Sequence, residues 1–107
     1  MLNISIDLES LNDYKDPRQI YTFLSENEIK NKSYISLIGK IAAKKAFFKC
    51  IDNNYDFKKI EIRNSSSGRP YIEIIDDELR KKFKNKKIDI SISHTKDIAI
   101  AICLIYE

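Results

Sequence analysis

The sequence is poor in the residues that mark many familiar classes of protein. Its 107 residues include 2 glycines, 2 prolines, 2 cysteines, 1 histidine and no tryptophan. So little glycine and proline excludes collagen-like and linker sequences. Cys50 and Cys103 lie within apolar runs and lack metal-ligand spacing, so we expect buried, reduced thiols. CxxC, GxSxG and glycine-rich phosphate-binding motifs are also missing from the sequence, which excludes most familiar catalytic families.

Long hydrophobic segments are missing too. The longest apolar run, Ile98 to Tyr106, is too short to cross a bilayer as a helix. The residues before Asp7 have no basic stretch of the kind that opens a signal peptide. Since 43% of the residues are hydrophobic and 33% charged, the composition is that of a globular protein. We expect one cytoplasmic domain over residues 1–107, large enough to bury about two thirds of its unfolded surface.

The charge is mildly basic. Nineteen Lys and Arg against 16 Asp and Glu give a net charge of +3. This balance favours an anionic partner, such as a phosphate compound, an acidic protein or a nucleic acid, although a solvated lysine-rich surface gives the same count. A nucleic-acid-binding module is the least favoured of these, because the aromatic-and-basic motif of an RNA-binding sheet is not found in the sequence.

The N-terminal half predicts a strand followed by helices. Residues 1–7 alternate between apolar and polar, which is typical of a half-buried strand with Asp7 facing away from the isoleucines. Asp16 and Pro17 predict a helix start, and Ser25 with Glu28 predicts the capping box of a further short helix. A long helix is expected from Ser33 to Ile51, with small residues that allow close packing.

The C-terminal half predicts more strands. Two strands, residues 59–63 and 71–75, flank a turn, and a charged helical turn follows at residues 77–85. A hairpin joins strands 88–93 and 98–106, and the second of these is apolar on both faces and therefore expected to be central and buried. The expected fold class is α+β, with a mostly antiparallel sheet packed on one long helix.

Few residues stand out as chemical candidates when each is taken alone. The single histidine, His94, lies at a strand end, and Asp7 lies at the end of another. On the long helix, Lys40 and Lys44 are one turn apart, as are Lys45 and Lys49 on a different side. Each of these features is more common as a structural or solvated residue than as part of a site.

Taken in order, however, four segments resemble one family. Lys40 to Lys49 (KIAAKKAFFK) is similar to the long-helix motif of the holo-acyl-carrier-protein synthases, which are small 4'-phosphopantetheinyl transferases. Ile4 to Leu8 (ISIDL) resembles the first strand of that family, Gly68 to Ile72 (GRPYI) its Gly-basic-Pro turn, and Ile90 to Asp97 (ISISHTKD) its closing hairpin. The resemblance runs essentially end to end.

The resemblance implies both a fold and a reaction. Such proteins transfer 4'-phosphopantetheine from coenzyme A to a serine of an apo acyl carrier protein in fatty acid biosynthesis, as trimers that use Mg²⁺. It implies catalytic roles for Asp7, Lys44 and His94, with Asp7 also as metal ligand. It implies coenzyme A contacts at Lys49, Arg69, Pro70, His94 and Thr95. The expected partners are therefore apo acyl carrier protein, coenzyme A and two further copies of this chain.

One position departs from the family pattern. Lys45 stands where the family has a metal-binding glutamate, and a cation cannot ligate a cation. Two like charges at about 4 Å repel by about 4 kcal/mol at an effective dielectric constant near 20. One hypothesis is that the Lys45 ammonium takes the place of the ion, pairs with Asp7 and contacts the diphosphate of coenzyme A directly. The alternative is a catalytically impaired relative that binds carrier protein or coenzyme A without turnover.

Overall fold

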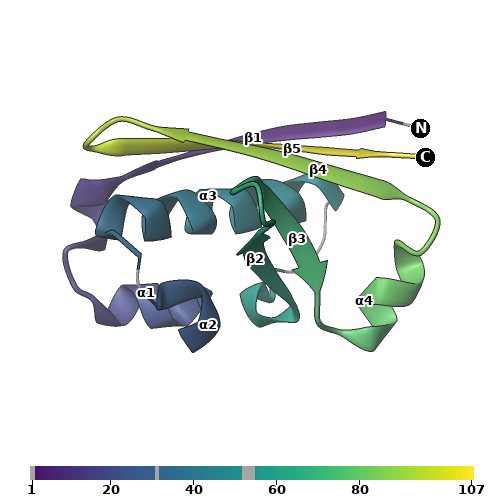
Figure 1. Cartoon of the computed structure of the whole chain (residues 1–107), viewed down its shortest axis with the longest axis horizontal. Helices are drawn as coiled ribbons and strands as arrows, with labels where there is room; N and C mark the ends of the chain where they lie inside the picture. Colours follow the sequence, from purple (N-terminus) through teal and green to yellow (C-terminus); the bar gives the residue numbers. More distant parts are fainter. Residues whose placement is uncertain (1, 31, 52–54) are drawn as a thin grey trace.

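A computed structural model describes residues 2–30, 32–51 and 55–107. The chain forms a sheet of long strands, a helix beneath it, and a lower layer of short helices and two shorter strands (Figure 1). The elements are, in order, β1 (Leu2–Ser10), η1 (Leu11–Tyr14), α1 (Arg18–Phe23), α2 (Glu26–Ile29), α3 (Tyr34–Ile51), η2 (Phe57–Lys59), β2 (Ile60–Asn64), β3 (Pro70–Ile74), α4 (Asp77–Lys82), β4 (Lys87–His94) and β5 (Ile98–Tyr106). This arrangement confirms the expected α+β class and its long helix. Within the described residues, none of the helices has the length and hydropathy of a membrane span.

The strands form two antiparallel sheets instead of one. The larger sheet has the order β1-β5-β4, so β5 is central as expected, and β2 pairs with β3 separately. In the larger sheet Asp7 of β1 and Ile92 of β4 both lie opposite Ala101 of β5. Residues of β1 and β4 that face the helix are therefore held on opposite sides of β5.

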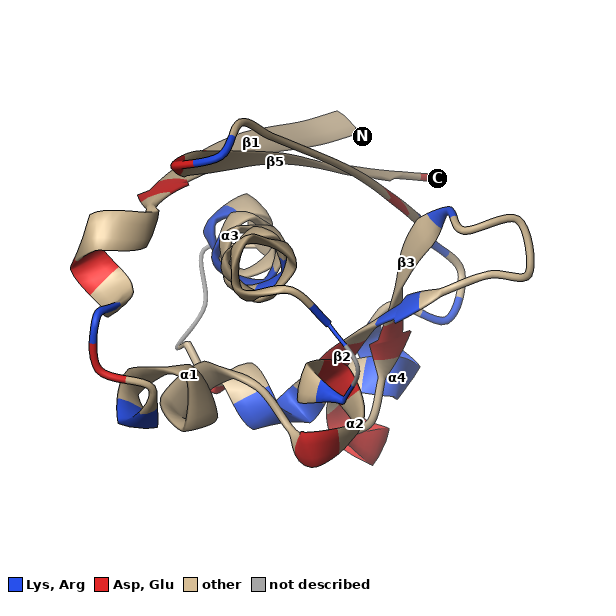
Figure 2. Ribbon diagram, turned by 60° about the vertical axis from the view of Figure 1, so that its left-hand side comes forward, with Lys and Arg blue, Asp and Glu red and all other residues tan. Residues whose placement is uncertain are grey.

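Helix α3 is buried on nearly all sides. Figure 2 shows it between the larger sheet and the layer that contains α1, α2 and β2. As its small size predicts, Gly39 lets α3 pack closely against β4. A side chain would not fit here, because a Cβ at this position would lie 2.8 Å from Cγ2 of Ile92. Cys50 of α3 and Cys103 of β5 are buried free thiols, as expected.

Strand β1 buries its polar face, although its alternating sequence predicts that the apolar face is buried. Its apolar residues Leu2, Ile4, Ile6 and Leu8 point outward and are 53–60% exposed. Its polar residues face α3, where the Asn3 side chain donates to the carbonyl of Cys50 and the Ser5 hydroxyl donates to the carbonyl of Ala46. Asp7 and Glu9 are buried on the same side. The expectation that Asp7 faces away from its isoleucines is correct, but it is the Asp7 face that is inside, because the partners of its polar groups lie on α3.

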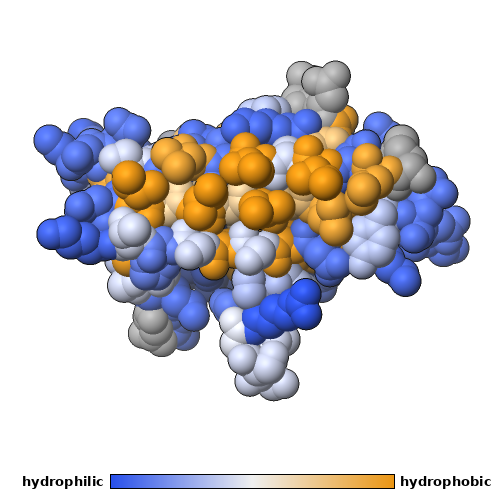
Figure 3. Space-filling view, turned by 90° about the horizontal axis from the view of Figure 1, so that it is seen from above, coloured by the Kyte–Doolittle hydropathy of each residue, from blue (hydrophilic) through white to orange (hydrophobic). Residues whose placement is uncertain are grey.

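The outer face of β5 is likewise exposed. Ile98 and Ile102 are 41% and 42% exposed, whereas Ala99, Ala101 and Cys103 pack against α3. β5 is therefore buried on one face, not on both as its sequence predicts. Figure 3 looks onto this side of the sheet and shows apolar side chains across it.

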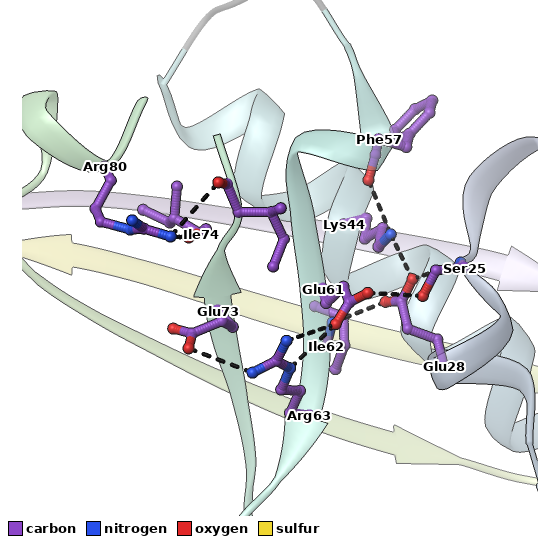
Figure 4. Close-up of polar contacts among 11 residues, drawn as sticks. Ser25, Glu28, Lys44, Phe57, Glu61, Ile62, Arg63, Glu73, Ile74 and Arg80 are labelled. Atoms are coloured by element: carbon purple, nitrogen blue, oxygen red, sulfur yellow. Dashed lines mark hydrogen bonds and ion pairs between the residues drawn. The ribbon is translucent and has the colours of Figure 1, made fainter. Parts of the chain in front are cut away.

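Lys44 lies in the interior. Its side chain is fully buried, and its ammonium donates to the carbonyl of Phe57 at 2.8 Å and to Oε1 of Glu28 at 2.7 Å (Figure 4). It also donates to the carbonyl of Phe23 at 2.8 Å. An ammonium has three N–H groups, so none remains for a ligand. Burial lowers the pKa of Lys44. The catalytic role that the resemblance implies for Lys44 does not fit this geometry, and the residue instead joins α3 to the lower layer.

Glu28 completes this buried pair. It forms the predicted capping box with Ser25, whose backbone N–H donates to Oε1 at 2.9 Å. Its other oxygen accepts the N–H of Ile62 in β2 at 2.7 Å. A single carboxylate thus connects α2, α3 and β2.

The Glu28→Gln variant tests this connection. Removing one partner of a buried ion pair leaves an uncompensated charge, so we expect a loss of about 3 kcal/mol or more in the free energy of unfolding. The matched control is Glu26→Gln, an exposed position on the same short helix, with an expected change below about 1 kcal/mol. Urea unfolding measures both, and equal effects of the two variants would contradict this role of Glu28.

Candidate functional site

Two carboxylates of β1 meet two lysines of α3. Alternation along β1 places Asp7 and Glu9 on the face toward the helix. Nζ of Lys49 lies 2.7 Å from Oδ1 of Asp7, and Nζ of Lys45 lies 3.1 Å from Oε1 of Glu9. We call these four residues the β1–α3 charge cluster.

The pairing within the cluster corrects one hypothesis. Lys45 was expected on Asp7, but it contacts Glu9, and Lys49 contacts Asp7. The reason is geometric, because two residues along a strand span about 6.6 Å and one helical turn rises about 5.4 Å. Successive inward residues of β1 therefore match successive turns of α3.

Lys45 is held by aromatic groups as well as by Glu9. Its ammonium donates to the Tyr14 hydroxyl at 3.1 Å and lies 5.0 Å from the centre of the Phe23 ring. The Tyr14 hydroxyl in turn donates to Glu9. A carboxylate, a hydroxyl and a ring face together fix the ammonium in one place.

Asp7 carries the most perturbed carboxyl of the cluster. Asp7 is 6% exposed, and its Oδ2 atom has no hydrogen-bond partner in the described part of the chain. Burial, followed by a hydrogen bond with Glu9, raises the pKa of Asp7 to about 6. Burial alone would also raise the pKa of Glu9, but hydrogen bonds with Asp7, Tyr14 and Lys45 outweigh it and lower that pKa. Asp7 is therefore the member of this carboxyl pair that holds a proton in mildly acidic solution.

A second group of candidate residues lines a pocket on the other side of α3. The pocket has a volume of about 210 Å³, and we call it the His94 pocket. It lies between the first half of α3, the β2–β3 turn and the end of β4. Its lining residues are Lys32, Ser36, Lys40, Ile62, Asn64, Gly68, Pro70, Ile92 and His94.

Several of these residues were not singled out from the sequence. Lys40 was noted only as a helix lysine; it donates to the carbonyl of Glu28 at 2.8 Å, and burial lowers its pKa. Its position one turn before Lys44 was the available signal. Lys32, Ser36 and Asn64 carried no such signal, because only the folded chain brings them to His94.

The remaining predicted residues lie at the margins of this pocket. Pro70 lines it, whereas Arg69 lines a smaller neighbouring pocket of about 90 Å³ with Tyr71 and Asp89. Nδ1 of His94 lies 2.9 Å from the carbonyl of Thr95. The Thr95 hydroxyl accepts backbone N–H groups at 3.1 and 3.2 Å and so shapes the β4–β5 loop.

The cluster and the pocket do not meet within one chain. Lys40 and Lys49 are nine residues apart on α3, which corresponds to about 13 Å along the helix axis. His94 is on β4 and Asp7 is on β1, with β5 between the two strands. The predicted site residues therefore form two separate groups.

The charge cluster does not fit a bound Mg²⁺ ion. Mg²⁺ needs oxygen ligands in a near-octahedral arrangement, whereas both carboxylates here already accept hydrogen bonds from ammonium groups. The described residues include no group of three or more acidic, histidine or cysteine side chains placed to hold a metal ion.

Comparisons with known proteins identify the family. No protein-family model matches the chain. The chain is 40% identical over 90 residues to a holo-[acyl-carrier-protein] synthase of Halothermothrix orenii, covering 78% of this chain and 72% of that protein. It is 30% identical to the holo-[acyl-carrier-protein] synthase of Caldicellulosiruptor bescii over an alignment of 117 positions that covers 97% of each.

Solved structures agree with these relatives. The holo-[acyl-carrier-protein] synthase of Helicobacter pylori, crystallised with coenzyme A, superposes with a TM-score of 0.82 at 28% identity, covering 95% of this chain and 98% of that one. The Plasmodium yoelii holo-ACP-synthase superposes with a TM-score of 0.75 at 26% identity, covering 98% and 94%. The fold is that of a phosphopantetheinyl transferase. The chain belongs to the holo-[acyl-carrier-protein] synthase family.

The Asp7→Asn variant tests the buried carboxyl. Asp7 has a pKa of about 6 in the folded state against an ordinary 3.8, so its contribution to stability is complete below the lower value and is lost as the pH rises through the higher one. Asparagine has no such proton. We therefore expect Asp7→Asn to gain about 1–2 kcal/mol relative to the natural chain between about pH 5 and pH 7.5.

Urea unfolding at several pH values provides this measurement. The readout is the change with pH, because the lost contact with Lys49 gives an offset that is the same at each pH. Asn12→Ala, at an exposed position nearby on η1, is the control, and its difference from the natural chain should stay flat because it removes no titratable group. A flat difference for Asp7→Asn as well would show that Asp7 has an ordinary pKa.

Proposed function

We propose that this protein transfers 4'-phosphopantetheine from coenzyme A to a serine of an apo acyl carrier protein. The observation that carries the proposal is the 40% identity with the Halothermothrix orenii holo-[acyl-carrier-protein] synthase. The coenzyme A bound to the Helicobacter pylori relative supports the choice of donor. The comparisons give no support to a catalytically impaired relative, nor to a nucleic-acid-binding module.

In this reaction both the β1–α3 charge cluster and the His94 pocket have a role. The serine oxygen attacks phosphorus, the bond to the departing adenosine 3',5'-bisphosphate breaks, and the serine proton is released. Phosphoryl transfer of this kind depends on positioning and on neutralising phosphate charge. We assign the nucleotide and its phosphates to the His94 pocket, where His94 and Lys40 supply donors and Pro70 forms part of the wall. Thr95 shapes the loop that follows His94, and Arg69 lies in the smaller neighbouring pocket.

The diphosphate linkage belongs at the charge cluster in this proposal. Lys45 and Lys49 are partly exposed there, and Asp7 orients Lys49. Lys44 has no role in contacting the cofactor, because its three N–H groups are used inside the protein. The protein would act in the cytoplasm in fatty acid biosynthesis, and the free thiols of Cys50 and Cys103 are in keeping with a reducing compartment.

A homotrimer would bring the two groups together. Neither group alone holds all the predicted site residues, so a complete site needs the pocket of one copy beside the cluster of the next. Contiguous exposed apolar patches are typical of protein interfaces. The outer face of the larger sheet is such a patch (Figure 3), formed by Leu2, Ile4, Ile6, Leu8, Ile98 and Ile102.

Mass spectrometry of the carrier tests the proposed transfer. We expect apo acyl carrier protein incubated with this protein and coenzyme A to gain the mass of one phosphopantetheine group, and a carrier without its acceptor serine to gain nothing. His94→Ala should lower kcat/KM by about 10- to 100-fold, as expected for a lost hydrogen bond to a charged group. Lys82→Ala, on exposed α4, should leave the rate unchanged. Coenzyme A that remains intact beside an unmodified natural carrier would contradict the proposal.

The Ile102→Asp variant tests the assembly. A charge at the centre of an apolar interface is left unpaired on association, so we expect a shift from trimer to monomer in sedimentation analysis, with loss of transfer. Ile75→Asp is a matched control, because Ile75 is 41% exposed but lies outside the larger sheet. A natural chain that is both monomeric and active would refute the shared site.

A further inference from the structure

We propose that Lys45 and Lys49, held by Glu9 and Asp7, bind the diphosphate of coenzyme A in place of a divalent cation. Binding would then need no magnesium. This inference rests on the proposed function and adds to it the way in which the phosphate charge is neutralised.

Each of these two ammonium groups has one N–H that is not used in a hydrogen bond within the described part of the chain. Lys45 donates to Glu9 and Tyr14, and Lys49 donates to Asp7 at 2.7 Å and to the carbonyl of Ile6 at 3.1 Å. An ammonium has three N–H groups. The third N–H of each has no partner in the part of the chain that the structure describes, in contrast to Lys44, whose three are all used.

Exposure places the positive groups nearest to the solvent. The Lys45 side chain is 25% exposed and that of Glu9 is 10%, and the Lys49 side chain is 42% exposed and that of Asp7 is 7%. A diphosphate approaching from solvent therefore meets the ammonium groups first. The carboxylates behind them act as positioning residues.

The charges of the cluster reproduce those of an occupied ion site. Two carboxylates and one divalent cation have a formal charge of zero, and so do Asp7, Glu9, Lys45 and Lys49. An added Mg²⁺ at Oδ1 of Asp7 or Oε1 of Glu9 would have to displace the ammonium groups that already lie 2.7 and 3.1 Å from these atoms. Glu9 of β1 thus balances the positive charge that Lys45 of α3 adds to the cluster.

Calorimetry with coenzyme A tests this substitution. For the natural chain we expect affinities within about threefold of each other in excess EDTA and in excess MgCl₂. Lys45→Gln should weaken binding about tenfold or more in both buffers, as for the loss of a charge-assisted hydrogen bond. Lys82→Gln, the matched control on α4, should bind as the natural chain does.

A second probe locates the effect at the diphosphate. Adenosine 3',5'-bisphosphate lacks that linkage, so Lys45→Gln should change its affinity little, and this result also shows that the variant is folded. Binding of coenzyme A by the natural chain only when Mg²⁺ is present would overturn the inference, as would equal affinity of Lys45→Gln and the natural chain.

The transfer assay separates this inference from the proposed function. Carrier modification that requires added Mg²⁺ leaves the proposed function standing and refutes metal-independent binding. Failure of coenzyme A to bind in either buffer, together with an unmodified carrier, refutes both. Modification in excess EDTA supports both.

Discussion

Four lysines on a helix with little exposed surface impose the main constraint on this structure. Taking an ammonium out of water costs several kcal/mol unless oxygen atoms surround it. Lys44 obtains them from Glu28 and two carbonyls, and Lys40 from the carbonyl of Glu28. Lys45 and Lys49 obtain them from the two carboxylates of β1. The arrangement of elements around α3 is thus also an arrangement of partners for its charges.

Depth of burial divides these lysines by role. Where the ammonium is enclosed and all its N–H groups are used, as at Lys44, the residue joins α3 to α2 and η2. At the edge of β1 the ammonium groups remain partly exposed and keep one N–H each, so they are available to an anion. Lys44 and Lys45 are adjacent in the sequence, but Lys44 stabilises the fold and Lys45 is available to bind an anion.

The sequence predicts the parts of this fold that depend on local spacing. The capping box of Ser25 and Glu28, the long helix and the closing hairpin all appear, with ends within three residues of those expected. Resemblance to a family led to Asp7, Lys49 and His94. The inward face of β1 was not predictable, since alternation defines two faces without saying which is covered. That choice depends on contacts such as Glu9 with Lys45, which are 36 positions apart. The adjacent Lys44 and Lys45 likewise give no local sign of which one is enclosed.

A crystal structure of the protein with coenzyme A, grown in the presence of Mg²⁺, is the most direct test of the account. The account predicts diphosphate oxygens within hydrogen-bond distance of both the Lys45 and Lys49 ammonium groups, with Glu9 and Asp7 still behind them. An octahedral ion on Asp7, with the two lysines displaced from their carboxylates, would contradict it.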